Sequence, residues 1–259
     1  IGMLIGAGAS ARVSIMLGAR DYRGAELVLG NTLVMLLINA TIYITLFGIF
    51  MDEILLSFGA SETSLPYARD FMMYILPGML VMNVTFSFNS IMRSSGYPIK
   101  AMVSMFIGAG ANLVLAPLFI FVFDMGIKGA AIATDIAMVI SMIFVMAHFF
   151  SKKSTLRFVK GIYRLRWKII WGIVAVGAAP CFVNIAGSAI NGIINTALYK
   201  YGGDVSVAAV GIFITYTSLL SMIVVGICQG MQPIVGYNYG ARRLDRLNKT
   251  FWLSVGAGS

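Results

Sequence analysis

The sequence predicts an all-α integral membrane protein, a polytopic bundle of membrane-spanning helices. Three observations lead to this prediction: 59% of the 259 residues are hydrophobic, only 11% are charged, and the mean hydropathy is +0.89. A soluble domain is about 45–50% apolar and about 25% charged, so this composition lies outside that class. The chain has enough apolar residues for seven helices of about 20 residues, the length that crosses a bilayer.

Seven apolar runs reach membrane length. They cover residues 1–17, 27–50, 67–92, 101–123, 128–150, 169–199 and 206–239, and a further apolar run starts at 250. We expect helices rather than barrel strands, because barrel strands are shorter and alternate polar with apolar residues. The chain begins within one apolar helix and stops within another, so we expect it to be a piece of a longer protein.

The loops between these runs alternate in charge. Fifteen of the nineteen Lys and Arg residues lie in four alternate loops, at 18–26, 93–100, 151–168 and 240–249. Six of the ten acidic residues lie in the intervening loops and at the edges of the spans. Because short cytoplasmic loops carry the excess of Lys and Arg, the sequence places the four basic loops in the cytoplasm.

Several function classes are disfavoured by the residue content. The only histidine is His148, and the two cysteines, Cys181 and Cys228, lie in apolar runs, so neither a metal site nor a disulfide scaffold is expected. No P-loop motif is present, so ATP is not the expected energy source. We interpret the basic run 151–168 as a topological signal or an interfacial linker rather than a nucleic-acid site. One histidine and one acid inside the spans do not suffice for an intramembrane enzyme.

Two segments of the chain repeat one another. Residues 8–20 align with 230–242 at a constant offset of 222, and five of thirteen positions match, including Gly-Ala-Arg at 18–20 and 240–242. The second copy lies six spans after the first, so both repeats have the same orientation, as in two-lobed transporters. We expect two six-helix lobes in a protein of about 444 residues, of which this chain holds helices two to eight of twelve.

The repeat also predicts the domain organisation. Residues 1–150 would form the N-terminal lobe without its first helix, and residues 151–168 a basic cytoplasmic linker. Residues 169–259 would form the truncated start of the C-terminal lobe.

Polar residues inside the later spans are candidates for lining a substrate cavity. Four of them recur at i, i+4, i+7 and i+11, on one face of a helix. Lipid cannot satisfy their hydrogen bonds, so they face either a cavity or another helix, and the same two alternatives hold for two glutamines in the next span. Pro180 and Pro233 are expected to kink these two helices. The cavity candidates are Asn184, Ser188, Asn191 and Asn195, followed by Gln229 and Gln232.

Asp135 is the only acidic residue well inside a span. A carboxylate in the membrane is costly, and by default it indicates an ion or proton pathway. The alternative is a structural aspartate that is hydrated near the outer interface or paired with Arg or Lys.

Three stretches of the sequence resemble the multidrug and toxic compound extrusion (MATE) family, in particular its bacterial MepA-like branch. Residues 91–134, IMRSSGYPIKAMVSMFIGAGANLVLAPLFIFVFDMGIKGAAIAT, are similar to the region of the fourth to sixth helices. Residues 226–243, GICQGMQPIVGYNYGARR, resemble the eighth helix with its following loop, and residues 178–184, AAPCFVN, resemble the start of the seventh helix. The resemblance extends over essentially the whole chain.

This resemblance implies a secondary active exporter of drugs or organic cations, driven by Na⁺ or H⁺ antiport with alternating access. We accordingly expect no enzyme activity, and no cofactor other than the coupling ion. The expected partners are an amphipathic or cationic small molecule and the lipid bilayer, without nucleic acid. We expect a monomer in the inner (plasma) membrane of a bacterium.

The resemblance also implies a cation site, from which this chain departs at one position. Family members carry Asn-x-x-x-Asp in the fifth helix and a Thr in the sixth. Asn112 and Thr134 match this pattern, whereas Ala116 replaces the Asp. Asp135, the neighbour of Thr134, could supply the missing carboxylate. The candidates for cation coupling are therefore Asn112, Thr134 and Asp135.

A flippase for lipids or lipid-linked oligosaccharides, from the related exporter superfamily, is the alternative function. It predicts several cationic residues in the cavity to bind a pyrophosphate. Apart from Arg69 and Lys128 at span edges, Arg12 is the only cationic residue inside the predicted spans, which disfavours this alternative.

Overall fold

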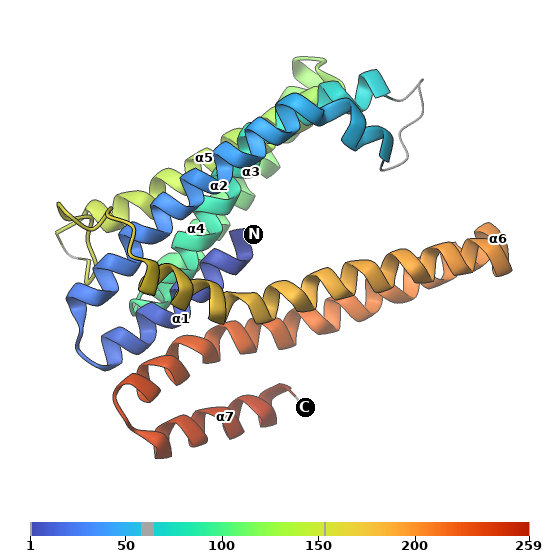
Figure 1. Ribbon diagram of the computed structural model, residues 1–259. Helices are drawn as coiled ribbons and strands as arrows, with labels where there is room; N and C mark the ends of the chain where they lie inside the picture. Colours follow the sequence, from blue (N-terminus) through green and yellow to red (C-terminus); the bar gives the residue numbers. More distant parts are fainter. Residues whose placement is uncertain (1, 58–64, 153, 259) are drawn as a thin grey trace.

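The computed structural model describes residues 2–57, 65–152 and 154–258; the side chains of some helical residues, chiefly between 195 and 209, lie outside the described set. Over the described residues every regular element is a helix (Figure 1), which confirms the all-α fold class. In chain order the elements are α1 (Gly2–Gly18), α2 (Tyr22–Ser57), α3 (Leu65–Ser94), α4 (Pro98–Pro117), the π-helix η1 (Leu118–Val122), α5 (Gly126–Phe150), α6 (Trp167–Gly240) and α7 (Leu244–Gly258).

Six segments of the described chain are long and apolar enough to cross a membrane, and α1 is a shorter apolar helix. The helices extend beyond the predicted apolar runs. For example, α2 begins at Tyr22, five residues before the run at 27–50. Its first turn is polar, and Asp21 accepts a 2.8 Å hydrogen bond from the backbone N–H of Gly24. Such a cap stabilises a helical turn that hydropathy alone does not detect.

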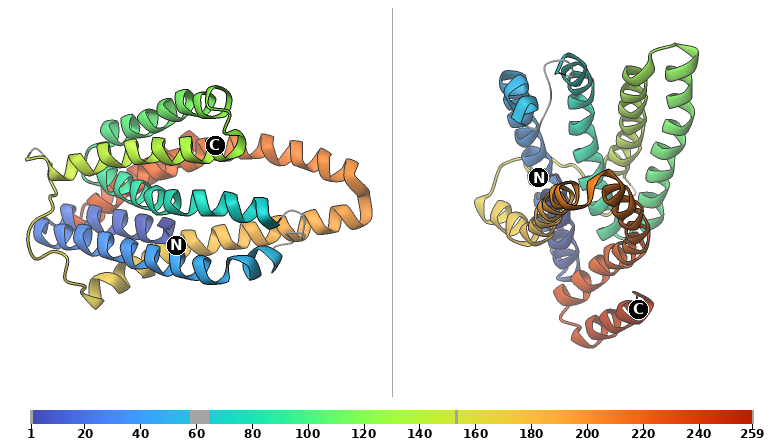
Figure 2. Two further views of the ribbon diagram at one scale, coloured as in Figure 1. Left: turned by 90° about the horizontal axis from the view of Figure 1, so that it is seen from above. Right: turned by 90° about the vertical axis from the view of Figure 1, so that its right-hand side faces the viewer.

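The helix α6 is not a single rod. Figure 2 shows that the chain runs out and returns within it, so that its two ends lie toward the same end of the molecule. We call Trp167–Asn191 the first arm and Phe213–Gly240 the second arm; each is apolar and long enough to span a membrane. These arms correspond to the last two membrane spans predicted from the sequence.

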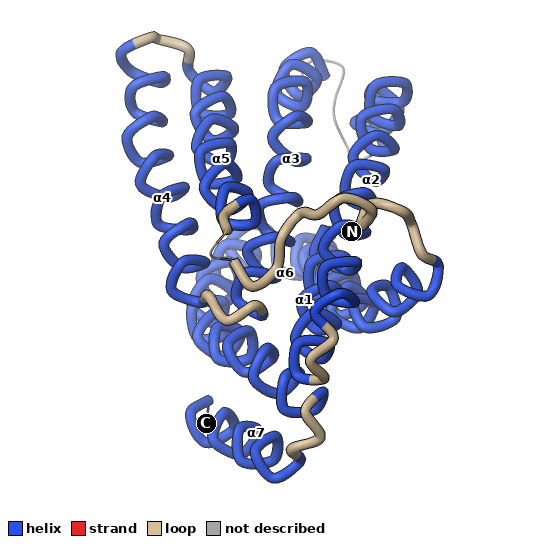
Figure 3. The backbone as a smooth tube through the Cα atoms, turned by 90° about the vertical axis from the view of Figure 1, so that its left-hand side faces the viewer, coloured by secondary structure: helices blue, strands red, loops and turns tan. Residues whose placement is uncertain are grey.

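Four helices form a layer, and α1 joins this layer to the two arms. In Figure 3 the helices stand in the order α2, α3, α5 and α4, and contacts join each to the next. The helix α1 packs on α2 and α3 on one side and on α6 on the other. Among the described residues, the layer itself touches α6 only through α2 and α3, and the two parts diverge toward the tip of the arms (Figure 1).

The four basic loops lie at the same end of the molecule, at the left of Figure 1. They are the turns at 19–21, 95–97 and 241–243 and the segment 151–166 between α5 and α6. We call this end the basic end. The alternation of charge along the sequence thus corresponds to an alternation of loops between the two ends of the bundle.

The segment 151–166 packs against the basic end of the layer rather than extending away from it. Asn31, fully buried in α2, donates from Nδ2 to the carbonyl oxygens of Ile162 and Arg164 at 3.3 and 3.2 Å. Its Oδ1 accepts a 2.9 Å hydrogen bond from the backbone N–H of Arg166. The same side chain therefore binds the linker at three successive points.

An aromatic cluster fills the core beneath this linker. The rings of Phe88 and Phe149 meet edge to face with 5.6 Å between their centroids, and the ring centroid of Phe158 in the linker lies 5.8 Å from that of Phe88. Phe88 and Phe149 are fully buried. Because large buried aromatics contribute much of the packing energy of a core, this cluster stabilises the packing of the linker against the layer.

The first arm crosses α1 through two glycines. A Cβ on Gly8 would collide with the carbonyl oxygen of Ile173, and a Cβ on Gly177 would collide with the carbonyl oxygen of Leu4. Small residues allow such close backbone approach between membrane helices.

The second arm makes the equivalent crossing nearer the basic end. A Cβ on Gly18 would meet the carbonyl oxygen of Tyr237, and a Cβ on Gly240 would meet that of Ile15. These backbone contacts hold the arms against α1 where the layer and the arms converge.

Candidate functional site

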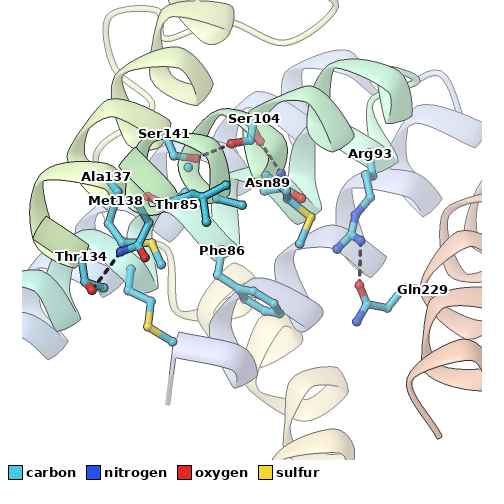
Figure 4. A pocket seen from close by; sticks show the side chains of 16 residues that line it. Thr85, Phe86, Asn89, Arg93, Ser104, Thr134, Ala137, Met138, Ser141 and Gln229 are labelled. Carbon is cyan, nitrogen blue, oxygen red and sulfur yellow. Dashed lines mark hydrogen bonds between the residues drawn. The ribbon is translucent and has the colours of Figure 1, made fainter. Parts of the chain in front are cut away.

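A cavity of about 630 Å³ lies between α3, α4 and α5 and reaches the second arm of α6 (Figure 4). This volume is within the range of about 300–1,000 Å³ that is typical of small-molecule sites. The lining is mostly apolar, and Gln229 is the single described residue that α6 contributes. The larger apolar side chains are Met82, Phe86, Met105, Leu113 and Met138.

A chain of hydrogen bonds ties the three helices together along the cavity wall. Asn89 of α3 donates from Nδ2 to Oγ of Ser104 and to the carbonyl oxygen of Ala101, both at 2.7 Å. Ser141 of α5 donates to the carbonyl oxygen of Ser104 at 2.8 Å. All four residues are buried. The hydrogen bonds therefore fix the relative positions of α3, α4 and α5 at the cavity.

The structure brings together two of the three candidates for cation coupling. Asn112 of α4 donates from Nδ2 to Oγ1 of Thr134 on α5 at 3.0 Å, and both residues line the cavity. Thr134 in turn donates to the carbonyl oxygen of Ala130 at 2.9 Å. These side chains offer neutral oxygen atoms, and hard cations such as Mg²⁺ and Ca²⁺ are usually bound with at least one carboxylate.

Asp135, the third candidate, faces a different neighbour. A Cβ built on Gly78 would collide with its carboxylate, so the carboxylate lies directly against α3. Pro77, which lies inside α3, precedes that contact. Asp135 is not among the described residues that line the large cavity. Whether it replaces the carboxylate absent at Ala116 stays a prediction.

Arg93 lies at the basic end of the cavity, in the last turn of α3. The apolar run ends at 92, which predicts a loop at Arg93, but the helix continues to Ser94. Its guanidinium donates to Oε1 of Gln229 at 2.7 Å and to Oγ of Ser90 at 3.1 Å. The Arg93–Gln229 hydrogen bond joins the layer to the second arm across the cavity (Figure 4).

The polar stripe of the first arm lies away from the large cavity. Asn184 and Ser188 are exposed, and Asn184 donates from Nδ2 to the carbonyl oxygen of Pro180 at 2.8 Å. Asn191 lines a separate hollow of about 360 Å³, together with residues of the second arm such as Thr217. The side chain of Asn195 lies outside the described residues. Their role in substrate binding stays a prediction.

The remaining candidates lie within the two arms of α6, where a kink at Pro180 or Pro233 stays a prediction. Gln229 faces the large cavity, whereas Gln232 donates from Nε2 to the carbonyl oxygen of Ala7 in α1 at 3.4 Å. Pro180 and Pro233 both lie inside α6. Gln232 thus contributes a contact between α1 and the second arm.

Several cavity residues were not among the sequence candidates. Thr85, Asn89 and Arg93 recur every four residues along α3, so the helical period that selected the stripe of the first arm would also have selected them. Ser104 and Ser141 carry a weaker signal, since single serines in membrane helices are common. What the sequence does not show is which polar stripes from three helices face one another.

Comparisons with known proteins give the family. The model of the MatE family matches residues 1–118 and 180–258. The multidrug export protein MepA of Staphylococcus aureus (strain NCTC 8325 / PS 47) is 24% identical over 258 residues, which cover 99% of this chain and 57% of the relative. The chain therefore spans a little over half the length of this curated relative, which is named as an exporter and not as an enzyme.

Solved structures show the same fold. "Crystal structure of MATE in the straight conformation" matches with a TM-score of 0.89 and 24% identity, covering 100% of this chain and 58% of that one. "Outward-facing conformation of a multidrug resistance MATE family transporter of the MOP superfamily" matches with a TM-score of 0.87 and 24% identity, covering 99% and 57%. From its family-model match, its relatives and its fold, the chain belongs to the MatE family, the transporter family that its sequence motifs resemble.

Proposed function

We propose that the protein carrying this chain is a secondary active exporter of amphipathic small molecules that works by alternating access. The observation that carries the proposal is the position of the cavity. It lies between α3, α4 and α5 of the helical layer and reaches Gln229 of the second arm. At the basic end the second arm contacts the layer through the Arg93–Gln229 hydrogen bond and contacts α1 through Gly18 and Gly240. A central site that rocking of two halves exposes in turn to each side is the general scheme of such transporters.

The geometry fits one state of that cycle. The layer and the arms converge at the basic end and diverge toward the opposite end (Figure 1). If the basic end is cytoplasmic, as the excess of Lys and Arg indicates, this state has a closed cytoplasmic side. The relatives named as multidrug export proteins support export as the direction of transport.

We propose that an ion gradient supplies the energy, with Na⁺ or H⁺ as the coupling ion. An ion drives such a cycle when it binds the inward and outward states with different affinity. Asn112, Thr134 and Asp135 are the candidates for this site, and a carboxylate in a span is the group that most directly supports a proton or cation role. Support from geometry is strongest for Asn112 and Thr134, which are hydrogen bonded in the cavity.

The lining of the cavity supports an amphipathic cargo. Methionine and aromatic side chains accept ligands of many shapes, which supports an amphipathic cargo for a cavity lined by Met82, Met105 and Met138. The family resemblance implies organic cations, but no carboxylate is present among the described residues of the lining. The inner membrane of a bacterium and a monomeric state belong to the same proposal.

A flippase remains the alternative. Arg93 gives the cavity one cationic side chain, and a pyrophosphate would favour several such groups because each contributes charge-assisted hydrogen bonds. One arginine supports this alternative less well than it supports a singly charged ligand.

Reconstitution of the whole protein into proteoliposomes tests the proposal. We expect amphipathic fluorescent compounds to be transported only when a Na⁺ or pH gradient is imposed, and transport to stop when an ionophore dissipates the gradient. Transport of a labelled lipid with no dependence on either gradient would contradict the exporter and favour the flippase.

A further inference from the structure

Arg93 is the only charged residue among the described residues that line the large cavity. The described lining contributes no aspartate or glutamate. A cavity that receives organic cations is expected to offer them carboxylates or electron-rich aromatic faces, because both attract positive charge. The charge of this lining has the opposite sign.

The hydrogen-bond partners of Arg93 leave its charge uncompensated. It is half-buried, and its two hydrogen bonds go to the neutral oxygen atoms of Gln229 and Ser90. Neither the Arg23–Glu26 nor the Arg69–Asp52 ion pair includes it. A guanidinium carries five N–H donors in a planar fork that matches a carboxylate, sulfonate or phosphate. An unpaired cation away from bulk water therefore favours an anionic partner.

The rest of the cavity is shaped for an apolar group. From Arg93 to Met82 the lining follows α3 for about 16 Å, at 1.5 Å per residue. Met82 lies toward the end away from the charge, and Phe86, Met105 and Met138 are further large apolar side chains of the lining. The cavity is thus positive at the basic end and mostly apolar over the remainder, where the polar side chains of the lining, such as Asn112 and Thr134, are neutral.

We propose that this cavity binds a soluble amphipathic organic anion, with its carboxylate, sulfonate or phosphate on Arg93 and its apolar body along α3. The anion takes the place of Gln229 as the partner of Arg93, so binding competes with a contact that joins the layer to the second arm. This assignment of a cargo class rests on the proposed export function and names the chemistry of its site. A volume of about 630 Å³ suits a drug-sized molecule.

A matched pair of fluorescent probes tests the sign of the site. Pyrenebutyrate and pyrenebutyltrimethylammonium share an aromatic body and differ in the charge of the head group. Kd is measured for each by fluorescence titration of the detergent-solubilised whole protein. We expect the anion to bind at least about tenfold more tightly, a difference that one charge-assisted hydrogen bond accounts for.

Variants assign that preference to Arg93. Arg93→Gln is expected to raise the Kd of pyrenebutyrate about tenfold and to leave the Kd of the cationic probe unchanged or lower. Arg93→Lys is expected to retain most of the preference for the anion. Arg246→Gln removes an exposed arginine of α7 and serves as the matched control. Gln229→Glu tests the site with Arg93 intact. The new carboxylate would pair with the guanidinium and weaken the binding of pyrenebutyrate.

Three results of the binding measurements would overturn the proposal. They are tighter binding of the cationic probe by the wild type, an unchanged Kd for pyrenebutyrate in both Arg93→Gln and Gln229→Glu, and stronger binding of dihexanoyl phosphatidylglycerol than of pyrenebutyrate. The last would assign Arg93 to a lipid headgroup. Gradient-driven transport of the cationic probe without anion binding would refute this proposal and leave the exporter intact. Anion binding without any gradient-driven transport would refute the exporter and leave the anion site intact.

Discussion

Gly18 and Gly240 lie 222 residues apart, and each packs its Cα directly against the backbone of the other's helix. A Cβ on Gly18 would collide with the carbonyl oxygen of Tyr237, and a Cβ on Gly240 would collide with that of Ile15. Ile15 and Tyr237 are also 222 residues apart. The contact is therefore reciprocal, as expected of two repeats related by a two-fold axis.

The turns that follow these glycines have the same local structure. Arg20 and Arg242 both adopt left-handed backbone angles, with φ of 60° and 57°. The backbone N–H of Ala19 donates to the carbonyl oxygen of Ile15 at 3.0 Å, and that of Ala241 donates to the carbonyl oxygen of Tyr237 at 2.9 Å. The offset of 222 inferred from five sequence matches thus describes equivalent positions in the fold.

We predict that Gly240→Ala opens the basic end. The added methyl group would meet the backbone of Ile15, which cannot move aside as a side chain can, so the crossing of α1 and the second arm must separate. Overpacking of this kind costs about 1–3 kcal/mol. We expect a lower thermal unfolding midpoint, and faster labelling of Met138→Cys in the cavity by an impermeant thiol reagent applied from the cytoplasmic side.

Gly230→Ala is the matched control for that experiment. Gly230 lies on the same arm, and a Cβ there has no neighbour within 4 Å. We expect wild-type stability and labelling. Equal effects of the two substitutions would show that the second arm tolerates no methyl group anywhere, and would remove the argument for a specific contact.

The repeat also shows what sequence reasoning could reach. Gly18 and Gly240 were recognised as equivalent because the chain keeps a Gly-Ala-Arg tripeptide at both. That the two copies contact each other could not be predicted, because a repeat gives equivalence and not distance. The spans could be predicted because length and apolar composition are local properties of the sequence. The start of α2 could not, because its polar first turn depends on the cap at Asp21.

A second prediction concerns Asn31, which fixes the basic linker to α2. Asn31→Ala would leave the backbone groups of Ile162, Arg164 and Arg166 without this partner, at a cost of about 1–3 kcal/mol for buried groups. We expect faster cleavage by trypsin after Arg164 and Arg166. Asn238→Ala is the control, since its Nδ2 bonds only within its own helix, to the carbonyl oxygen of Ile234 at 2.9 Å. Unchanged cleavage in Asn31→Ala would contradict the role of this side chain.

A third prediction tests the orientation in the membrane. With Cys181 and Cys228 replaced by serine, Lys160→Cys and Arg246→Cys at the basic end should be labelled only from the cytoplasm, and Met125→Cys at the opposite end only from outside. Impermeant thiol reagents applied to intact cells and to inverted vesicles make the measurement. Labelling of Lys160→Cys in intact cells would reverse the assigned topology.

The candidate site was predicted less completely than the fold. Asn112 and Thr134 came from the family resemblance, and they meet in the structure at 3.0 Å. Arg93 was missed because an arginine at the end of an apolar run usually signals a loop, and here α3 continues around it. The stripe from Asn184 to Asn191 has helical spacing, but spacing alone does not tell which helix or cavity the stripe faces.

The last prediction concerns Asp135 as the group that couples an ion to export. If its carboxylate replaces the one absent at Ala116, Asp135→Asn should abolish gradient-driven transport in proteoliposomes while membrane insertion stays intact. Asparagine keeps the size and hydrogen bonding of aspartate, but it can neither release a proton nor balance the charge of Na⁺. The structure adds a second test, because Gly78→Ala would force the carboxylate away from α3 without removing it.

Relocating the charge separates coupling from structural support. The double variant Ala116→Asp with Asp135→Asn should recover part of the activity, since it returns a carboxylate to α4 one helical turn from Asn112. A purely structural aspartate predicts mild loss in Asp135→Asn and no rescue in the double variant. Transport by Asp135→Asn that keeps its full dependence on pH and Na⁺ would show that coupling occurs elsewhere. The Asn112–Thr134 pair would then serve to join α4 to α5, as the Asn89–Ser104 hydrogen bond joins α3 to α4.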